Sequence, residues 1–331
     1  CVYSYFLYPL VLKLVPARPP ADIPGIGDSG LPRLSLIITA HNEEGRIREK
    51  LENTLATDFP RDRLEIIVAS DFSTDATDRI VESCADQGIR LVRADERKGK
   101  EYAQLCAIRA SGGDILVFSD VATRIPADAL RLLARHFADA RIGALSSEDR
   151  FVSKDGRVVG EGAYIKYEMW LRRQESDRAG LVGLSGSFFA ARRVVCGDWD
   201  IQSPSDFKTA LNCAKQGLVA ITSPDVIGIY TDVEDPGLEY RRKIRTVIRG
   251  ITAIARHPEV LNPLRMGQFA FQVWSHKIMR WGVPWFMLVF AVLTLMLQGQ
   301  GMIYTLALMA QIAFYALALA GWLFSRLRDN A

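Results

Sequence analysis

Several common signatures of nucleotide and metal binding are missing from the 331-residue sequence. No G-x-G-x-x-G follows the first apolar strand and no G-K-[S/T] occurs, which argues against a dinucleotide-binding Rossmann enzyme and a P-loop ATPase. The five cysteines, at positions 1, 84, 106, 196 and 213, form no C-x-x-C and have no metal-ligand spacing. Scattered cysteines of this kind are typical of a reducing compartment. The formal net charge is only +3, so no global field favours nucleic acid as a partner.

Ionised side chains are also missing from two long stretches near the C-terminus, Trp281–Leu297 and Met302–Phe324. Each is long enough to cross a bilayer as a helix, which takes roughly 20 apolar residues. The tight polar turn Gln298–Gly301 separates them, so they predict a hairpin of transmembrane helices at residues 278–299 and 302–325. Basic residues flank both outer ends, which places those ends in the cytoplasm by the positive-inside rule. The alternative is a buried hairpin in a soluble protein.

The first fifteen residues are mostly apolar and aromatic, interrupted by Pro9 and Lys13. They lack the basic start and the small-residue cleavage site of a signal peptide. We therefore interpret residues 1–15 as the end of an N-terminal transmembrane helix. Residues 16–33 are rich in Pro and Gly and are expected to form a linker.

The middle of the chain alternates apolar runs with helical segments, in the order expected for a parallel α/β sheet. Each run has the length of a strand and is followed by a polar loop and a segment compatible with a helix. A βαβαβαβ order of this kind implies right-handed crossovers. The expected strands are Leu34–Ala40, Leu64–Ala69, Ile89–Arg93 and Ile115–Phe118, and a β-rich segment is expected at residues 147–167.

Asp120 follows the fourth of these runs, directly after Ser119. In an open α/β sheet, ligands bind in the crevice beyond the carboxyl ends of the strands. A carboxylate at this position can hold a divalent cation, which in turn can hold a diphosphate. It can equally cap the helix that begins near Pro126, and this stretch by itself leaves both interpretations open.

Three further segments contain residues that could bind a ligand or take part in catalysis. The small-residue loop Gly183–Ser187 lets the backbone approach a ligand closely, or is an ordinary tight turn. Asp206 lies in the first turn of a predicted helix, where it could also be only an acid matched to the helix dipole. A helix within residues 236–277 has one apolar side flanked by arginines. It suits a membrane interface or a clamp for a diphosphate, and a solvated basic face is the third alternative.

Six motifs, taken together and in this order, resemble those of family 2 glycosyltransferases with the GT-A fold. They are Ile38–Glu43 (I-T-A-H-N-E), Ser70–Asp75 (S-D-F-S-T-D), Lys98–Lys100 (K-G-K), Asp120–Thr123 (D-V-A-T), Ser205–Phe207 (S-D-F) and Arg242–Thr246 (R-K-I-R-T). The resemblance covers about residues 34–290 and extends to the membrane-embedded bacterial synthases of hyaluronan, chitin oligosaccharides and cellulose. It implies an α/β GT-A catalytic domain at residues 34–235, with a Rossmann-like mixed, mainly parallel sheet, joined to transmembrane helices.

The resemblance also implies roles for individual residues. Asp206 is expected to be the general base, and Asp120 the ligand of Mg²⁺ or Mn²⁺. The loop expected near the donor sugar or the acceptor contributes Gly183, Ser185, Gly186 and Ser187. The residues expected to bind the UDP-sugar are Thr39, His41, Glu43, Asp71, Lys98, Lys100, Ser119, Asp120, Arg242 and Arg245.

The sequence departs from the family pattern at a few of these positions. Ala122 stands at the second acid of the D-x-D metal motif, so a metal would depend on Asp120, the nucleotide phosphates and water. Ser70 replaces the acid before the expected uracil-binding aspartate. Arg242 and Thr246 replace the Gln and Trp of the Q-x-x-R-W motif of processive synthases.

The expected function is inverting transfer of a hexosyl or N-acetylhexosaminyl group from a UDP-sugar to a hydroxyl of a growing polysaccharide or lipid-linked acceptor. We expect a multi-pass protein of the bacterial inner membrane, in contact with membrane lipid. Its catalytic domain is expected in the cytoplasm. One alternative is transfer of a single sugar to a lipid. Another is a catalytically silent GT-A domain that acts as a membrane scaffold or nucleotide sensor, which Ala122 favours.

Overall fold

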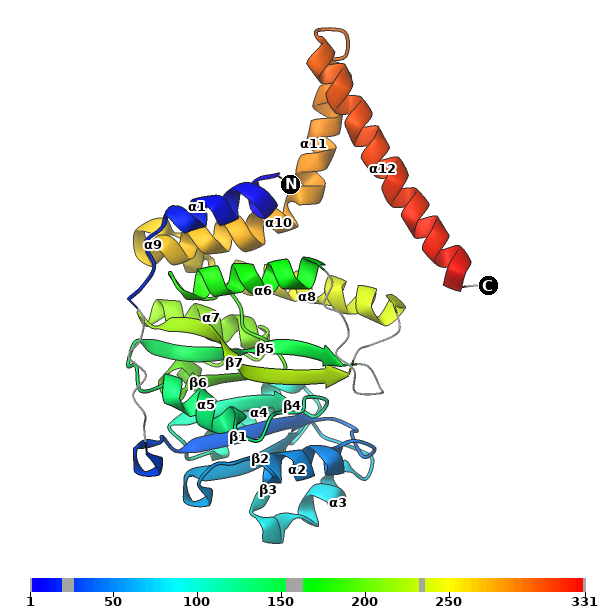
Figure 1. Cartoon of the computed structure of the whole chain (residues 1–331). Coiled ribbons are helices and arrows are strands. Elements are labelled where there is room, and N and C mark those ends of the chain that lie inside the picture. The colour runs from blue at the N-terminus through cyan, green and yellow to red at the C-terminus, as the bar shows by residue number, and fades with distance from the viewer. Residues whose placement is uncertain (1, 20–26, 153–162, 232–235, 330–331) are drawn as a thin grey trace. The chain divides into compact units, whose positions relative to one another are not determined.

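A seven-stranded sheet with strand order β3-β2-β1-β4-β6-β5-β7 is the centre of the larger part of the protein (Figure 1). The computed structural model describes residues 2–19, 27–152, 163–231 and 236–329. It divides into two units, one of residues 8–274 and one of residues 1–7 and 275–331. The strands are β1 Leu34–Ala40, β2 Leu64–Ser70, β3 Ile89–Arg93, β4 Ile115–Asp120, β5 Ile142–Val152, β6 Phe188–Arg192 and β7 Val219–Thr231.

The sheet is mixed and mainly parallel, as the sequence predicts. Strand β1 pairs in parallel with both β2 and β4, β2 with β3, and β5 with β7. Strand β6 runs antiparallel to both β4 and β5. All four strands predicted from the apolar runs are present and start at the predicted residues, and the second and fourth end one and two residues later than predicted. The predicted β-rich segment is only partly so: β5 begins earlier, at Ile142, and residues 153–162 lie outside the described parts of the chain.

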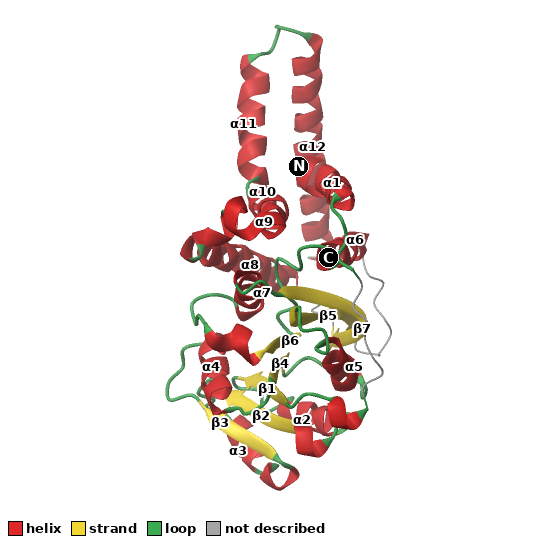
Figure 2. Ribbon diagram, turned by 90° about the vertical axis from the view of Figure 1, so that its left-hand side faces the viewer, coloured by secondary structure: helices red, strands yellow, loops and turns green. Residues whose placement is uncertain are grey.

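Helices cover both faces of this sheet, because its strands are apolar on both sides. In β1, Leu36 and Ile38 belong to one buried cluster and Ile37 to the other. Figure 2 shows α4 on one side of the strands and α2 and α5 on the other. The α-helices of this unit are α1 Tyr8–Leu14, α2 Ile47–Leu55, α3 Thr77–Glu82, α4 Lys100–Ala110, α5 Ala129–His136, α6 Ala163–Ser176, α7 Ser205–Lys215, α8 Pro236–Arg256 and α9 Pro263–Gln272. Short 3₁₀ turns occur at Asp28–Gly30, Arg61–Arg63, Ala85–Gln87, Arg193–Gly197 and Pro258–Leu261.

The N-terminal residues, predicted to be the end of a transmembrane helix, are helical from residue 2 to residue 14, and that prediction stays untested. A π-helix at Tyr3–Leu7 is followed by the short helix α1, which belongs to the unit that contains the sheet. Tyr8 is fully buried and its hydroxyl donates to Oε1 of Glu175 on α6, at 2.5 Å. Apolar residues on the opposite side of α1, including Leu10 and Leu14, are exposed. Helix α1 therefore has one side packed on the unit that contains the sheet and one exposed apolar side.

The smaller unit contains a hairpin of two apolar helices, α11 Val283–Met296 and α12 Met302–Asp329 (Figure 2). A π-helix at Val273–Ile278 and the short α10, Met279–Trp281, precede it. The side-chain amide of Gln311 on α12 donates to the backbone oxygen of Met287 on α11, at 2.8 Å. Such an interhelical hydrogen bond keeps a polar side chain away from an apolar surrounding.

The predicted multi-pass arrangement is not supported by these helices. Among the described residues, only Met302–Phe324 is by itself long and apolar enough to cross a membrane. The segment at Val283–Met296 has 14 residues and spans about 21 Å at 1.5 Å per residue, which is less than a bilayer core of about 30 Å. It qualifies only together with Pro263–Trp281, from which it is bent by 61°, as a broken span or a re-entrant segment. Gly282 and Pro284 lie at this break, and the sequence pattern alone did not reveal the bend.

Candidate active site

The carboxyl ends of the three neighbouring strands β2, β1 and β4 lie together at one edge of the sheet. Thr39 of β1 is level with Asp120 of β4, and Ala40 of β1 is level with Ser70 of β2. The backbone N–H of Asp71 donates to the oxygen of Ala40, at 2.9 Å. Polar loops that lie far apart in the sequence are therefore brought to one crevice by the strand register, as expected for this class of sheet.

A cavity of about 680 Å³ opens at this edge. Of the residues predicted to act in the site, Lys100, Asp120, Ser185, Gly186, Ser187, Asp206 and Arg245 line it. Arg249, one of the arginines beside the apolar side of the predicted basic helix, lines it as well. Charged and aromatic lining side chains that the sequence did not single out as functional are Arg46, Glu49, Lys50, Glu101, Arg124, Asp149, Arg172 and Tyr230. The cavity is therefore charged on several sides, which is the character of a site for a polar, ionised ligand.

Lys100 and Asp120 form an ion pair in the floor of this cavity. Lys100, the first residue of α4, places its Nζ 2.5 Å from Oδ1 of Asp120 and 2.7 Å from the backbone oxygen of Gly186. The backbone N–H of Asp120 donates to the oxygen of Ser187, at 2.9 Å. The end of β4, the start of α4 and the small-residue loop are thus held to one another by charge-assisted hydrogen bonds.

A second lysine ammonium lies beneath the same turn. Lys50 on α2 is almost fully buried, and its Nζ donates to Oγ of Ser119 at 2.7 Å and to the backbone oxygen of Thr123 at 2.6 Å. Burial lowers the pKa of Lys50 to about 7, although the nearby Asp120 carboxylate raises it. The sequence pattern could have indicated this burial, because Lys50 lies on the same side of α2 as the apolar residues Ile47 and Leu51.

Asp206 lies on the side of the cavity formed by α7. It is the second residue of that helix, where the helix dipole favours an ionised carboxylate. A Cβ atom added to Gly186 would lie 3.5 Å from Oδ2 of Asp206, so the loop backbone passes directly beside this carboxylate. The N–H of Leu184 donates to the backbone oxygen of Asp206, at 3.3 Å, which ties the loop to the helix. The small side chains of the loop thus leave space for a ligand at the carboxylate.

Asp149 of β5 and Tyr230 of β7, both partly buried, line the cavity beside this loop. Oδ1 of Asp149 accepts from the hydroxyl of Ser185 at 2.7 Å and from that of Tyr230 at 3.1 Å. Arg172 of α6 donates to Oγ of Ser146 at 2.7 Å, and that hydroxyl also accepts from the N–H of Ser185. Burial raises the pKa of the Tyr230 phenol, so it remains a neutral donor at ordinary pH. Hydrogen bonds on several sides therefore fix the position of Ser185.

Helix α8 contributes the basic side of the cavity. Arg245 and Arg249, one turn apart, both line it. Arg249 also pairs with the largely buried Glu101 of α4, at 2.6 Å, which fixes α8 against the start of α4. The side chain of Arg242, also predicted to bind the diphosphate, lies outside the described part of the chain.

The remaining predicted nucleotide-binding residues do not line this cavity. Asp71 lies one loop away, where its Oδ1 accepts from the N–H groups of Lys98 at 3.2 Å and Gly99 at 3.0 Å. Asp71 therefore holds the turn that leads into Lys100. Nδ1 of His41 lies 2.8 Å from the backbone oxygen of Asp71. The predicted residues outside the cavity lining are Thr39, His41, Glu43, Asp71, Lys98, Ser119 and Gly183.

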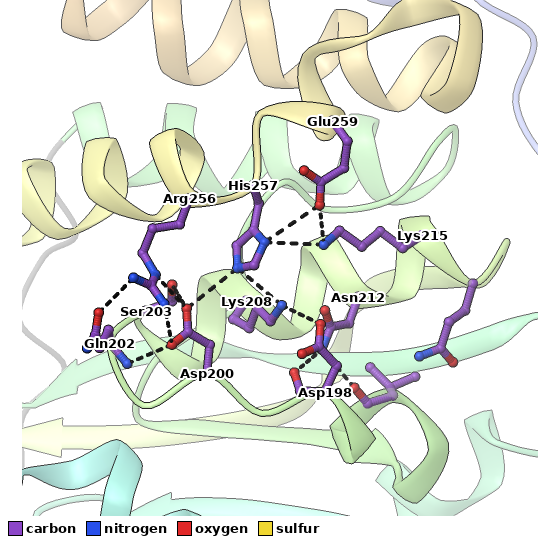
Figure 3. A network of polar contacts seen from close by, with 12 residues as sticks. Asp198, Asp200, Gln202, Ser203, Lys208, Asn212, Lys215, Arg256, His257 and Glu259 are labelled. Carbon is purple, nitrogen blue, oxygen red and sulfur yellow. Dashed lines mark hydrogen bonds and ion pairs between the residues drawn. The ribbon is translucent and has the colours of Figure 1, made fainter.

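A polar network supports the helix that carries Asp206 (Figure 3). Lys208, on the buried side of α7, places Nζ 2.6 Å from Oδ2 of Asp198 and 3.2 Å from Nε2 of His257. Nδ1 of His257 lies 3.3 Å from Nζ of Lys215, which pairs with Glu259. Burial and the two lysines lower the pKa of His257. The network connects α7 to the residues that follow α8. It therefore holds the helix that carries Asp206 in position against the helix that carries Arg245 and Arg249.

The described residues do not form a divalent-metal site by themselves. Among them, no three His, Cys, Asp or Glu side chains are grouped so that they could hold a metal ion. Ala122, at the position of the second acid, is exposed, and Oδ1 of Asp120 is already paired with Lys100. Resident Mg²⁺ and Mn²⁺ need several oxygen ligands, and the D-V-A-T turn at the end of β4 offers one carboxylate.

Comparisons with known proteins agree with this geometry. Residues 35–198 match the protein family described as "Glycosyl transferase family 2". It is 28% identical over 208 residues to the β-monoglucosyldiacylglycerol synthase of Synechocystis sp., which is 59% of this chain and 43% of that protein. It thus spans less than half of the length of this relative.

Solved structures extend the likeness to most of the chain. The mannosyltransferase PcManGT from Pyrobaculum calidifontis, solved with GDP-Man and Mn²⁺, has a TM-score of 0.71 and 26% identity, with coverage of 95% of this chain and 88% of that one. S. aureus TarS 1-349 in complex with UDP has a TM-score of 0.50 and 18% identity, over 73% of this chain and 72% of that one, a likeness of fold alone. With its GT-A-like sheet and the family match over residues 35–198, this part of the chain belongs to glycosyl transferase family 2.

Proposed function

We propose that the protein transfers a sugar from a UDP-sugar to an acceptor hydroxyl, with inversion at the anomeric carbon. The observation that carries this proposal is that Asp206 and the Lys100–Asp120 pair line one cavity, with Gly186 between them. The basic side chains of Lys100 and Arg245 can bind the diphosphate, and the Asp206 carboxylate can act as the base. Inversion needs these two functions on opposite sides of the reacting carbon.

The reaction can be written with the residues of this chain. The acceptor oxygen attacks the anomeric carbon, and its proton passes to the Asp206 carboxylate. The bond between that carbon and the β-phosphate oxygen breaks, and its electron pair leaves with UDP. Lys100 and Arg245 oppose the negative charge that develops on the diphosphate. A positioned base typically contributes about 10² to 10⁴ in rate.

The likeness to relatives supports the class of donor that we propose. PcManGT was solved with a nucleotide-sugar and Mn²⁺, which supports a nucleotide-sugar donor for this chain. Uridine as the base and Mg²⁺ or Mn²⁺ as the cofactor stay predictions. Whether a hexosyl or an N-acetylhexosaminyl group is transferred also stays open to experiment, since the relatives include a glucosyl- and a mannosyltransferase.

We further propose that the acceptor is membrane-bound, either a growing polysaccharide or a lipid-linked molecule. The name of the Synechocystis relative indicates a glycolipid product, which favours a lipid acceptor. Exposed apolar residues on α8, including Tyr240, Ile244 and Ile248, suit contact with lipid beside the cavity. With the apolar helix Met302–Phe324, they support a location at the cytoplasmic face of the bacterial inner membrane.

The test is substitution of the proposed base in full-length protein. Asp206→Asn keeps the shape of the side chain and removes its basicity, so sugar transfer should fall by about 10² or more while UDP binding stays. Transfer is measured as UDP release with a panel of UDP- and GDP-sugars in detergent or nanodiscs. Asp225→Asn, an exposed acid outside the cavity, is the matched control.

Wild-type turnover in Asp206→Asn would exclude this residue as the base. A catalytically silent nucleotide sensor is the second candidate, which the loss of the second acid at Ala122 favours. UDP binding without UDP release from any donor, in membranes that supply acceptors, would decide for the sensor.

A further inference from the structure

The end of β4 holds an unusual set of charges for a site that would bind a diphosphate through a metal. Asp120 is the acid of the metal motif that remains, and Ala122 leaves the second position without a ligand. The cavity is lined by seven basic side chains and five acidic ones. Two of those acids, Glu49 and Glu101, are paired with arginines. The lining is therefore positive before any cation from solution is added.

The ammonium of Lys100 lies where a cation on Asp120 would be useful. It is 2.5 Å from Oδ1 of Asp120 and 2.7 Å from the backbone oxygen of Gly186, so it touches the strand end and the ligand loop together. The side chain is about one-third exposed, so one side of the ammonium faces the cavity. Its position at the first residue of α4 adds the positive end of a helix to its charge.

Lys50 supplies a second amine from below, which is charged in about half of the molecules near pH 7 because burial lowers its pKa to about 7. Its Nζ holds Oγ of Ser119 and the oxygen of Thr123, the residues on either side of the D-V-A sequence. The turn that would close around a metal is therefore closed around a lysine. Because the residue is buried, its charge is screened by protein rather than by water, and its field at the cavity is strong.

We propose that Lys100, supported by Lys50, takes the place of the divalent cation at Asp120, so that the donor's diphosphate is bound and stabilised by protein ammonium groups. This inference rests on the proposed function and concerns the same cavity. A lysine ammonium provides a compact positive charge with three donors, and both properties suit phosphate oxygens. The nucleotide should therefore bind whether or not a divalent cation is present.

The experiment measures UDP binding by calorimetry to full-length protein in detergent, once with EDTA and once with Mn²⁺. Wild-type affinity should differ by less than about threefold between the two conditions, which is under 1 kcal/mol. Lys100→Met should weaken UDP binding by about tenfold or more in EDTA, and Lys100→Arg should retain most of it. Arg48→Met is the control, because Arg48 is exposed on α2 outside the cavity and carries the same charge.

A gain of metal dependence provides an independent measurement. Ala122→Asp restores the second acid at an exposed position, so the fold should tolerate it. In this variant, Mn²⁺ should strengthen UDP binding by about tenfold over EDTA, and in the wild type it should not. The comparison keeps the proposal testable even where Lys100→Met fails to fold.

Two results would overturn the proposal, and they are distinguishable. Loss of UDP binding from the wild type in EDTA, with recovery in Mn²⁺, would show that a metal displaces Lys100 from Asp120. In that case the proposed transferase function stands and only the role of the lysines is wrong. If folded wild type binds neither UDP nor GDP under either condition, the nucleotide-sugar function and this inference both fail.

Discussion

Burying the ammonium of Lys50 should cost the protein stability, and the cost should depend on pH. The pKa of this side chain is lowered from 10.5 to about 7, because burial disfavours the charged form more than the neighbouring carboxylate favours it. At 1.36 kcal/mol per pKa unit, this is roughly 5 kcal/mol of folding free energy lost at low pH. Lys50→Met removes that cost and also removes two hydrogen bonds worth about 0.5–1.5 kcal/mol each. The variant should therefore be more stable than wild type by about 2–4 kcal/mol at pH 6.

The sign of the pH dependence follows from proton binding. Below pH 7 the ammonium is charged in the folded and the unfolded chain, and the full penalty applies. Between pH 7 and 10.5 the folded chain releases this proton while the unfolded chain keeps it, so the stability of wild type rises with pH. From pH 6 to pH 9 the penalty should shrink by about 2–3 kcal/mol, which brings the advantage of Lys50→Met close to zero.

The measurement is urea unfolding of both proteins in detergent at pH 6 and pH 9, followed by tryptophan fluorescence. Only the difference between the variant and wild type is interpreted, since the other ionisable groups are common to both. Arg48→Met, from the exposed side of the same helix, should show no such pH-dependent difference. If Lys50→Met is less stable than wild type at pH 6, or if its advantage is equal at both pH values, the assigned burial cost is wrong.

Two further substitutions test the packing around the site. Gly113→Ala would place a Cβ 2.6 Å from the backbone N of Ser35 in β1, so it should cost about 1–3 kcal/mol and lower the melting temperature, whereas Gly112→Ala, with open space around it, should not. Asp198→Asn leaves the ammonium of Lys208 buried without its carboxylate, and should cost about 2–3 kcal/mol, less than for a fully buried pair because Asp198 is two-thirds exposed. A loss below about 0.5 kcal/mol in chemical unfolding would assign the Lys208 network no structural weight.

The strands could be predicted from sequence because burial on both faces gives short, continuous apolar runs between polar loops. Ile115–Phe118 is such a run, and the strand found there starts at Ile115 and continues two residues further, to Asp120. The order of the strands was less accessible. The pattern of apolar runs does not indicate that β6 lies between β4 and β5 and runs in the opposite direction. That reversal places Ser187 beside Asp120, and it arises from pairing between residues about seventy positions apart.

The site was predicted where a motif is contiguous and missed where it is assembled in space. Asp120, Asp206 and the loop at Gly186 occur in short recognisable sequences, and all three line the cavity. Asp149 and Tyr230 come from long strands at the far end of the sheet, and no local pattern distinguishes them. Asp71 was predicted to bind the nucleotide directly, but in the structure its carboxylate accepts hydrogen bonds from the turn before Lys100. A substitution there would change nucleotide binding through the position of that turn.

Helix α8 brings together two interpretations that the sequence left open. Its basic residues suited a diphosphate, its apolar residues suited a membrane, and each interpretation alone left half of the pattern without a purpose. In the structure Arg245 and Arg249, spaced by four, line the cavity, while Ile244, Val247 and Ile248 are exposed. A helix is about 10 Å across, so a bilayer covering the apolar side would lie about one helix diameter from the part of the cavity lining that α8 provides. A lipid-linked hydroxyl could then reach Asp206 without leaving the membrane surface, and this short distance is the physical reason to expect a membrane-bound acceptor.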